Sequence, residues 1–410
     1  MGLTLHALTA LRVIRSVRCG TVSGDLLRRC DMPSQASTPT RSWTRKRISQ
    51  KLAFLGEMAD FSETRPLDTL VADKAARIRT KGVRCSYRTA TYPNGAFIAL
   101  RKDVKIGGPE LTFVELAGVM DPAVHLLLGM ELCGCFSRNA LDPRNGDVTY
   151  KLKPVTTVER LRAFAQEARW IRGTRQALVT IDRIVENAWS PMEAIIATLI
   201  ALPAEELGYD LWPIALNPRK QLGAELAHLS DVQSRVPDIM FRASNVGLNY
   251  DGEDHFKLRS IAQAAVDADR HPEDPKYGKA LEDALAEARS HIVADKRRDR
   301  DLMTMGLTVF SATKEDLEER GGLDRLIGQV IEAIEAEGSR DLSAQRRMLK
   351  NQSRTEARQE LIWSLMPGRC AIRAHKRLEG LRGVLDHIEE YEIRFTMEDG
   401  QVKIVSTEKL

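Results

Sequence analysis

The stretch VPDIMFRASNVGLNYD, residues 236–251, contains two short apolar runs separated by a brief polar turn. Such runs, bounded by turn residues, are typical of β-strands, so the stretch predicts an antiparallel hairpin. We expect this hairpin to bring Asp238, at the start of the first run, close to Asp251, at the end of the second. Two neighbouring carboxylates repel each other unless positive charge lies between them, and a divalent cation with oxygen ligands is a common solution. A polar turn with solvated acids is the alternative interpretation.

The segments that follow the hairpin predict an α/β sheet. Residues 306–312 (GLTVFSA) read as a second, parallel strand, and residues 295–305 before them read as a helix. A helix followed by a strand beside a hairpin implies crossover connections. Residues 323–335 predict a covering helix, and the polar insertion 256–294 is expected to be helical and to cap the cleft.

Upstream, Ser190-Pro191-Met192-Glu193 predicts the start of a helix. Ser190 is a suitable N-cap, and proline is tolerated in the first turn because its missing N–H would be unpaired there anyway. Glu193 lies where the helix dipole favours a negative charge. The Ser-x-x-Glu spacing also fits a capping box, in which Glu193 serves the helix end alone.

The order of these motifs resembles a known arrangement. Residues 295–309 carry the complete pattern Asp-x-x-Arg-Asp-x-x-Leu-x-x-x-Gly-x-x-Val, after Ser-Pro-Met-Glu on a helix, Pro-Asp entering a strand, and an acidic strand end followed by histidine. Together they resemble the very-short-patch-repair-like branch of the PD-(D/E)XK nuclease superfamily. This resemblance implies an α/β fold with a restriction-endonuclease-like mixed sheet flanked by helices. Residues 67 to about 187 are similar to the body of the type IV abortive-infection antitoxins, which implies a smaller α/β N-terminal domain.

The resemblance also implies site residues. The family's helix glutamate falls on Glu193, its first strand aspartate on Asp238, and its lysine position on Asp251. Its second strand acid falls on Asn249, which keeps an oxygen but has no charge. The implied catalytic residues are Glu193, Asp238, Asp251 and His255, and the implied ligands of Mg²⁺ or Mn²⁺ are Asp238, Asn249, the Tyr250 carbonyl and Asp251.

Two classes of function are compatible with these residues. The first is metal-dependent endonuclease activity in bacterial defence or DNA repair, with Glu193 or His255 handling protons. Arg298 is then the expected nucleic-acid contact, although an ion pair with Asp295 or Asp301 on its own helix is the alternative. The second class is a catalytically inactive, antitoxin-like DNA-binding regulator or a partner of a toxin protein, in which the uncharged residue 249 marks lost catalysis.

Length and composition limit these hypotheses. A chain of 410 residues predicts two or three domains, and the net charge of +4 permits nucleic-acid binding without requiring it. No stretch approaches the roughly 20 apolar residues that span a bilayer, so no membrane association is expected. Six cysteines show no framework spacing, which predicts reduced thiols in the cytoplasm.

We expect four regions along the chain. Residues 1–66, rich in arginine, predict a flexible leader or residues added by an upstream start, with a phosphate-binding arm as the alternative. Residues 67–187 and 188–338 are the antitoxin-like and nuclease-like domains. Residues 339–410 predict a basic helical extension that ends in a β-hairpin turning at Asp399-Gly400. The basic residues between Arg340 and Arg382 either bind phosphates or only keep their helices solvated.

Inside the antitoxin-like region, the short apolar runs 68–72, 83–87 and 96–100 predict strands. Residues 107–117 predict a helix with Pro109 in its first turn. Apolar residues continue at helical spacing from Phe113 to Met130.

Overall fold

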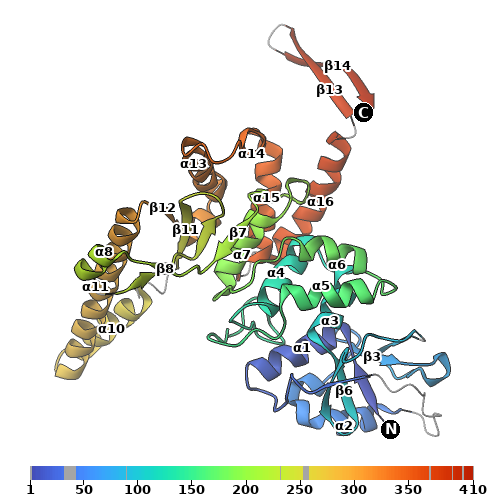
Figure 1. Cartoon of the computed structure of the whole chain (residues 1–410). Helices are drawn as coiled ribbons and strands as arrows, with labels where there is room; N and C mark the ends of the chain where they lie inside the picture. The colour runs from blue at the N-terminus through green and yellow to red at the C-terminus, as the bar shows by residue number, and fades with distance from the viewer. Residues whose placement is uncertain are drawn as a thin grey trace. The chain divides into compact units, whose positions relative to one another are not determined.

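The computed structural model describes residues 2–31, 43–88, 90–230, 232–252, 258–368, 371–389, 391–398 and 401–409. The chain forms two compact units, Met1–Leu202 and Pro203–Leu410. Each unit combines helices with a mixed β-sheet, so the predicted α/β class is confirmed at that level (Figure 1). None of the described helices is both long enough and apolar enough to cross a membrane.

A six-stranded sheet in the order β2-β5-β6-β1-β3-β4 organises the first unit. Its strands are β1 (Leu3–Leu5), β2 (Arg29–Cys30), β3 (Leu67–Val71), β4 (Val83–Tyr87), β5 (Phe97–Arg101) and β6 (Val104–Gly107). Strand β1 runs parallel to β6 and antiparallel to β3, so the sheet is mixed. The strands predicted at 68–72, 83–87 and 96–100 are confirmed as β3, β4 and β5.

The first residues of the chain lie in the middle of this sheet, which corrects the expectation of a flexible leader for the described part of residues 1–66. Leu3 and Leu5 are 2% and 0% exposed, and they pair with residues 104–106 on β6. Helix α1 (Ala7–Arg18) follows and buries Val13 and Ile14. The partners of β1 lie far along the chain, where no local pattern connects them with it. Residues 32–42 lie outside the described residues.

Helices α1 and α3 pack together and contact the sheet, and α4 to α7 form further helical packing beyond them. The remaining elements of the unit are α2 (Arg45–Leu52), η1 (Ala53–Ala59), η2 (Lys74–Ala76), α3 (Pro109–Ala117), α4 (Pro122–Leu132), α5 (Val158–Glu167), α6 (Thr174–Ile181) and α7 (Pro191–Ala201). Pro109 opens α3 as predicted. The apolar series from 113 to 130 is divided between α3 and α4, because Pro122 disfavours a helical conformation at the residue before it and starts a new helix.

A buried ion cluster joins α1 to α4 in the first unit. The carboxylate of Glu131 is 0% exposed and accepts hydrogen bonds from Arg15 Nε and Nη2 at 2.9 and 2.7 Å, and from Arg138 Nε at 2.8 Å. Burial acts to raise the pKa of Glu131, but Arg138 and Arg15 lower it well below its usual range. The carboxylate is therefore ionised, and two arginines balance its charge.

A four-stranded sheet in the order β12-β11-β10-β7 organises the second unit. Its strands are β7 (Ile214–Leu216), β10 (Ile239–Phe241), β11 (Val246–Asp251) and β12 (Thr308–Thr313). The predicted hairpin is confirmed, because β10 and β11 pair antiparallel. The predicted crossover is confirmed as well, because β11 and β12 are parallel and are separated by helices α10 (Leu258–Arg270) and α11 (Pro275–Thr304).

Helices α11 and α13 (Gly322–Ala336) both contact this sheet. The end of α11 places Leu302 against Met240 and Leu307, while α13 buries an apolar stripe as predicted. The remaining elements are η3 (Ala204–Glu206), β8 (Lys220–Gln221), α8 (Ala224–Leu229), β9 (Ser234–Arg235), α12 (Lys314–Glu318), α14 (Ser343–Leu349), α15 (Gln352–Leu365), α16 (Ala371–Glu389), β13 (Tyr391–Glu398) and β14 (Gln401–Lys409). The last two strands pair as the predicted hairpin, whose turn at residues 399 and 400 lies outside the described residues.

Candidate functional site

The hairpin register places Asp238 beside Asn249. Ile239 lies opposite Leu248, so the residue before Ile239 faces the residue after Leu248, not Asp251 as we expected. The backbone N–H of Asp238 donates to Asn249 Oδ1 at 3.0 Å. In return, the Asp238 carboxylate accepts the backbone N–H of Tyr250 at 2.7 Å. Three of the implied ligand residues are thus joined by hydrogen bonds across the strand pair.

The amide of Asn249 is 1% exposed. Its oxygen is used by the Asp238 N–H, and its Nδ2 has no hydrogen-bond partner among the described residues. A neutral amide can occupy such a position without a counter-charge, whereas a carboxylate there would need one. Asn249 therefore supports the pairing of β10 with β11, and its side chain can be buried there because it carries no charge.

Asp251 is paired with Arg298. Arg298 Nη2 lies 3.3 Å from Asp251 Oδ1 and 3.6 Å from Asp295 Oδ1, and the side chains of Arg298 and Asp251 are 19% and 17% exposed. Arg298 therefore pairs with Asp295 on its own helix, as the alternative interpretation expected, and it also neutralises Asp251. Asp301 is bound elsewhere, by Arg235 at 2.5 Å and by the hydroxyl of Ser230 at 2.8 Å.

These contacts already use part of the oxygen set that a divalent cation would take. Mg²⁺ prefers near-octahedral oxygen coordination, in which one or two carboxylates are joined by several waters. Here the Asn249 oxygen and one Asp238 oxygen accept backbone N–H groups, and a guanidinium lies against Asp251. Within the described ranges, no group of three or more His, Cys, Asp or Glu residues is arranged to hold a metal ion. We therefore derive no hydrolytic step from these residues.

Of the other two implied catalytic residues, Glu193 lies within the described part of the chain. Glu193 is in the first unit, at the start of α7, and is 4% exposed. Its backbone N–H donates to Ser190 Oγ at 3.2 Å, and its carboxylate accepts the N–H of Trp189 at 2.6 Å. The first bond is the N-cap bond of the predicted capping box, and the second comes from the residue before the N-cap. His255 lies outside the described residues.

Several arginines of the C-terminal region serve the second unit internally. Arg358 is 0% exposed and pairs with Asp324 at 2.7 Å. Other basic side chains between 340 and 382 also bind protein groups: Arg346 to Glu335, Arg354 to the Ala204 carbonyl, Arg377 to Glu360 and Arg382 to Glu206. Helix α15 buries Ala357, Leu361 and Ile362. This helix is therefore part of the packed unit and not a solvated extension.

An open basic hollow lies beside the edge strand β4 of the first unit, and our sequence reasoning missed it. The hollow measures about 550 Å³ and is lined by Lys74, Arg77, Ile78, Arg79, Val83, Arg84, Cys85 and Ser86. Four of these residues are basic and none is acidic. The signal in the sequence is the run from Lys74 to Arg88, which has six basic residues and no acid. It went unnoticed because the strand pattern of residues 83–87 overlaps it.

The four basic side chains of the hollow differ in how they are held. Arg77 donates to the Cys85 carbonyl at 3.2 Å and lies over the ring of Tyr87 at 5.6 Å. Arg84 pairs with Asp68 at 2.7 Å. Lys74 and Arg79 are exposed, and their side chains make no hydrogen bond or ion pair with another described residue. The hollow is thus lined by two basic side chains that protein groups hold in place, Arg77 and Arg84, and by two that are not held, Lys74 and Arg79.

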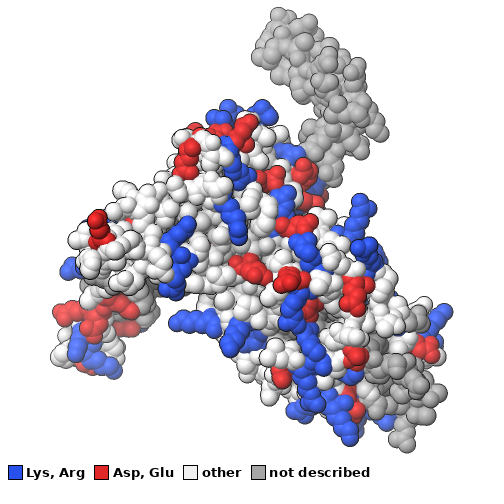
Figure 2. Space-filling model, in the orientation of Figure 1, with Lys and Arg blue, Asp and Glu red and all other residues white. Residues whose placement is uncertain are grey.

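On the face of the molecule that Figure 2 shows, Lys and Arg are interspersed with Asp and Glu. On that face the described residues form no broad area of a single charge sign. The hollow is identified by the four basic residues in its lining. Comparisons with protein-family models, with curated proteins and with solved structures found no match.

Proposed function

We propose that this chain binds nucleic acid through the basic hollow beside β4, and that its nuclease-like second unit does not cleave the bound strand. The observation that carries the proposal is the meeting of Lys74, Arg77, Arg79 and Arg84 around one open space without an acidic residue in its lining. Phosphate groups are the natural ligands of such a surface, because each contact with a cationic side chain releases a condensed counterion. Arg77, held by the Cys85 carbonyl and by Tyr87, would orient a phosphate, while Lys74 and Arg79 would adapt to it.

The proposal that the chain does not cleave nucleic acid rests on contacts in the second unit. Asn249 and Asp238 are engaged with backbone groups and Asp251 with Arg298, so hydrolysis would first require these contacts to break. The resemblance to nucleases then concerns the arrangement of strands and helices, with binding retained elsewhere. A toxin partner and a role in defence or DNA repair stay predictions from the resemblance.

Binding is tested by fluorescence anisotropy with a duplex and a single-stranded oligonucleotide of mixed sequence, between about 50 and 200 mM salt. Wild type should lose affinity steeply as salt rises. The double variant Lys74→Gln/Arg79→Gln should reduce the slope of log K against log salt by about 2, since each removed phosphate contact accounts for about one. The matched control is Arg169→Gln/Arg175→Gln, which removes two exposed arginines from the same unit. Equal behaviour of the two double variants, or a flat salt response of wild type, would refute the assignment of the hollow.

Cleavage is tested separately on plasmid and single-stranded DNA with Mg²⁺ or Mn²⁺. Wild type, Asp238→Ala and Asp251→Ala should all leave the DNA intact. Metal-dependent nicking by wild type that both alanine variants lose would instead establish a nuclease that works with Asn249 in place. Activity gained only in Asn249→Glu would show that the second unit is a nuclease fold whose catalysis has been lost.

A further inference from the structure

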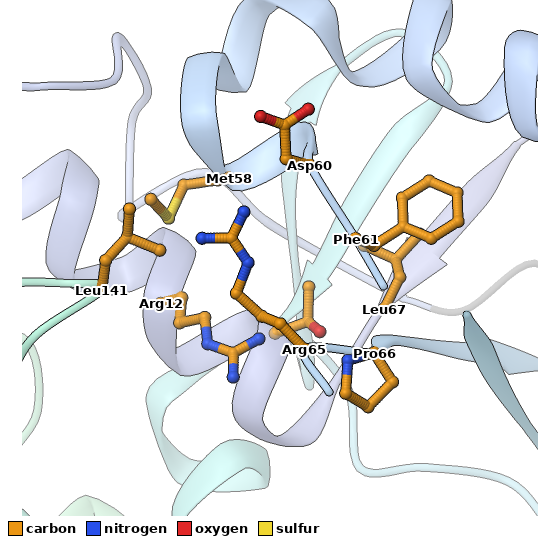
Figure 3. A pocket seen from close by; sticks show the side chains of 9 residues that line it. Arg12, Met58, Asp60, Phe61, Arg65, Pro66, Leu67 and Leu141 are labelled. Carbon is orange, nitrogen blue, oxygen red and sulfur yellow. The ribbon is translucent and has the colours of Figure 1, made fainter. Parts of the chain in front are cut away.

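Two arginines project into one small pocket of the first unit, away from the β4 hollow's lining. Arg12 comes from α1 and Arg65 from the segment before β3, and both guanidinium groups point into the space between these elements (Figure 3). Both side chains are half-buried. The other lining residues are Thr9, Met58, Asp60, Phe61, Pro66, Leu67 and Leu141.

Neither guanidinium has a carboxylate partner among the described residues. The Arg65 guanidinium donates one hydrogen bond, to the Glu57 carbonyl at 3.3 Å, and the Arg12 guanidinium donates none to a described residue. Asp68, the acid that raises the pKa of Arg12, already has partners on both of its oxygens. Arg84 binds Oδ1 at 2.7 Å, and Thr9 donates to Oδ2 from its N–H and its hydroxyl, each at 3.2 Å. Asp60 lines the pocket but forms no ion pair with either arginine.

This arrangement is electrostatically unfavourable without a further anion. Burial lowers the pKa of Arg12, Asp68 raises it, and the charges of Arg65 and Arg84 lower it again, with a lowered pKa as the net result. Like charges in a partly apolar pocket repel more strongly than they would in water, because the local dielectric constant is lower. An oxyanion between the two guanidinium groups would remove that repulsion and take up their free N–H donors.

We propose that this pocket is an oxyanion site, in which Arg12 and Arg65 together bind one phosphate group. Guanidinium groups match the oxygens of a phosphate in geometry and charge. The cavity measures about 10 Å³, which is room for one water-sized group, so one phosphate oxygen enters it while the rest of the group stays at the mouth. Met58, Phe61 and Leu141 shield the contact from water on their side. The site is separate from the proposed nucleic-acid hollow, and either can fail without the other.

Inorganic phosphate is the first probe, titrated into the full chain in a calorimeter at constant ionic strength. Arg12→Gln and Arg65→Gln should each weaken binding by about tenfold or more, as expected for loss of a charged hydrogen bond. Asp60→Asn should strengthen binding, because it removes the one acid in the lining. Arg175→Gln, an exposed arginine on α6, is the matched control and should bind as wild type does.

Thermal melting provides a second readout that does not depend on heats of binding. Arg12→Gln removes an uncompensated charge, so without phosphate it should melt at or above the wild-type temperature. Phosphate should raise the melting temperature of wild type more than that of Arg12→Gln; a general salt effect raises both equally. The titration is repeated with an oligonucleotide with and without a 5′-phosphate, which distinguishes free phosphate from a terminal phosphate of nucleic acid. Binding of either probe that depends on both arginines supports the site; no binding of either, or equal binding by Arg12→Gln, Arg65→Gln and wild type, overturns it.

Discussion

The side-chain oxygen of Asn249 accepts the backbone N–H of Asp238 at 3.0 Å, across the pairing of β10 with β11. The resemblance inferred from the sequence implies an acidic ligand at the position of Asn249. Here the amide completes a strand pair, and the same contact occupies the oxygen that a cation would need. In this structure the Asn249 side chain therefore makes a structural hydrogen bond between the two strands.

Asn249→Asp should therefore destabilise the second unit. The new carboxylate would be 1% exposed if the side chain kept its position, and it would lie beside the carboxylate of Asp238. We expect a loss of about 2–4 kcal/mol in the free energy of unfolding at neutral pH, measured by urea denaturation in EDTA. Asn351→Asp is the control: Asn351 caps α15, aspartate caps equally well, and the change should be within about 0.5 kcal/mol. Full recovery of Asn249→Asp on adding Mg²⁺ would show instead that these residues hold a divalent cation.

The buried pair Arg358 and Asp324 should be essential to the second unit. Asp324 also accepts the hydroxyl groups of Tyr209 at 2.6 Å and Thr355 at 2.7 Å, and Arg358 Nε donates to the Leu207 carbonyl at 3.0 Å. Asp324→Ala leaves the guanidinium buried without a counter-charge and should cost about 3–5 kcal/mol of unfolding free energy. The double variant Asp324→Leu/Arg358→Met, which removes both charges, should be less destabilised than Asp324→Ala. If both variants lose the same amount, charge burial is not the cause.

Glu131→Gln should have a comparable effect in the first unit. It keeps the shape of the side chain but leaves Arg15 and Arg138 buried beside each other, at a cost of about 3–5 kcal/mol. Because the pKa of Glu131 is lowered in the folded state, its contribution is present above the pKa of the unfolded chain, about 4.5, and is lost as pH falls through the folded pKa. The difference between wild type and Glu131→Gln should therefore shrink in acid. Amide exchange in α4 at neutral pH reports the first unit alone, and Glu167→Gln on the surface of α5 should leave it unchanged.

His125 should make the first unit sensitive to mild acid. It is 1% exposed, its Nε2 lies 2.9 Å from the Phe113 carbonyl and its Nδ1 lies 3.1 Å from the Thr180 hydroxyl. Burial lowers its pKa to about 4, an effect that the Phe113 carbonyl only partly offsets.

The unfolded chain binds a proton at this histidine near pH 6.5 and the folded chain only near pH 4, so stability falls as pH decreases between these values. From pH 7 to pH 5 the loss from His125 alone is about 2 kcal/mol. His6 works in the opposite sense, because its pKa is raised in the folded state: burial lowers it, but Glu115 raises it more. Urea denaturation of wild type and His125→Gln at both pH values isolates the effect, and a parallel pH dependence of the two proteins would exclude it.

Local features of this fold could be predicted because their causes act over a few residues. The apolar runs of β10, β11 and β12, the N-cap Ser190 and the opening proline of α3 are each decided by neighbouring residues in the chain. The same holds for α13, whose apolar stripe recurs at helical spacing. These features were enough to predict the α/β class and the hairpin that carries Asp238.

Features that depend on partners distant in sequence were not predictable. Strand β1 is only Leu3–Leu5 and acquires its central place from β3 and β6. Arg358 reads as a solvated helix residue, yet it is buried because Asp324 and the Leu207 carbonyl meet it from other segments.

The sequence by itself determined the strands β10, β11 and β12, the helix α13, and the presence of several oxygen-bearing side chains on one hairpin. Only the tertiary structure decided what those side chains do: the register set Asp238 against Asn249, and packing of α11 on the sheet brought Arg298 to Asp251. The physical reason is that periodicity and capping are properties of a single segment, whereas register and charge pairing depend on two segments whose approach is settled by the packing of the whole unit.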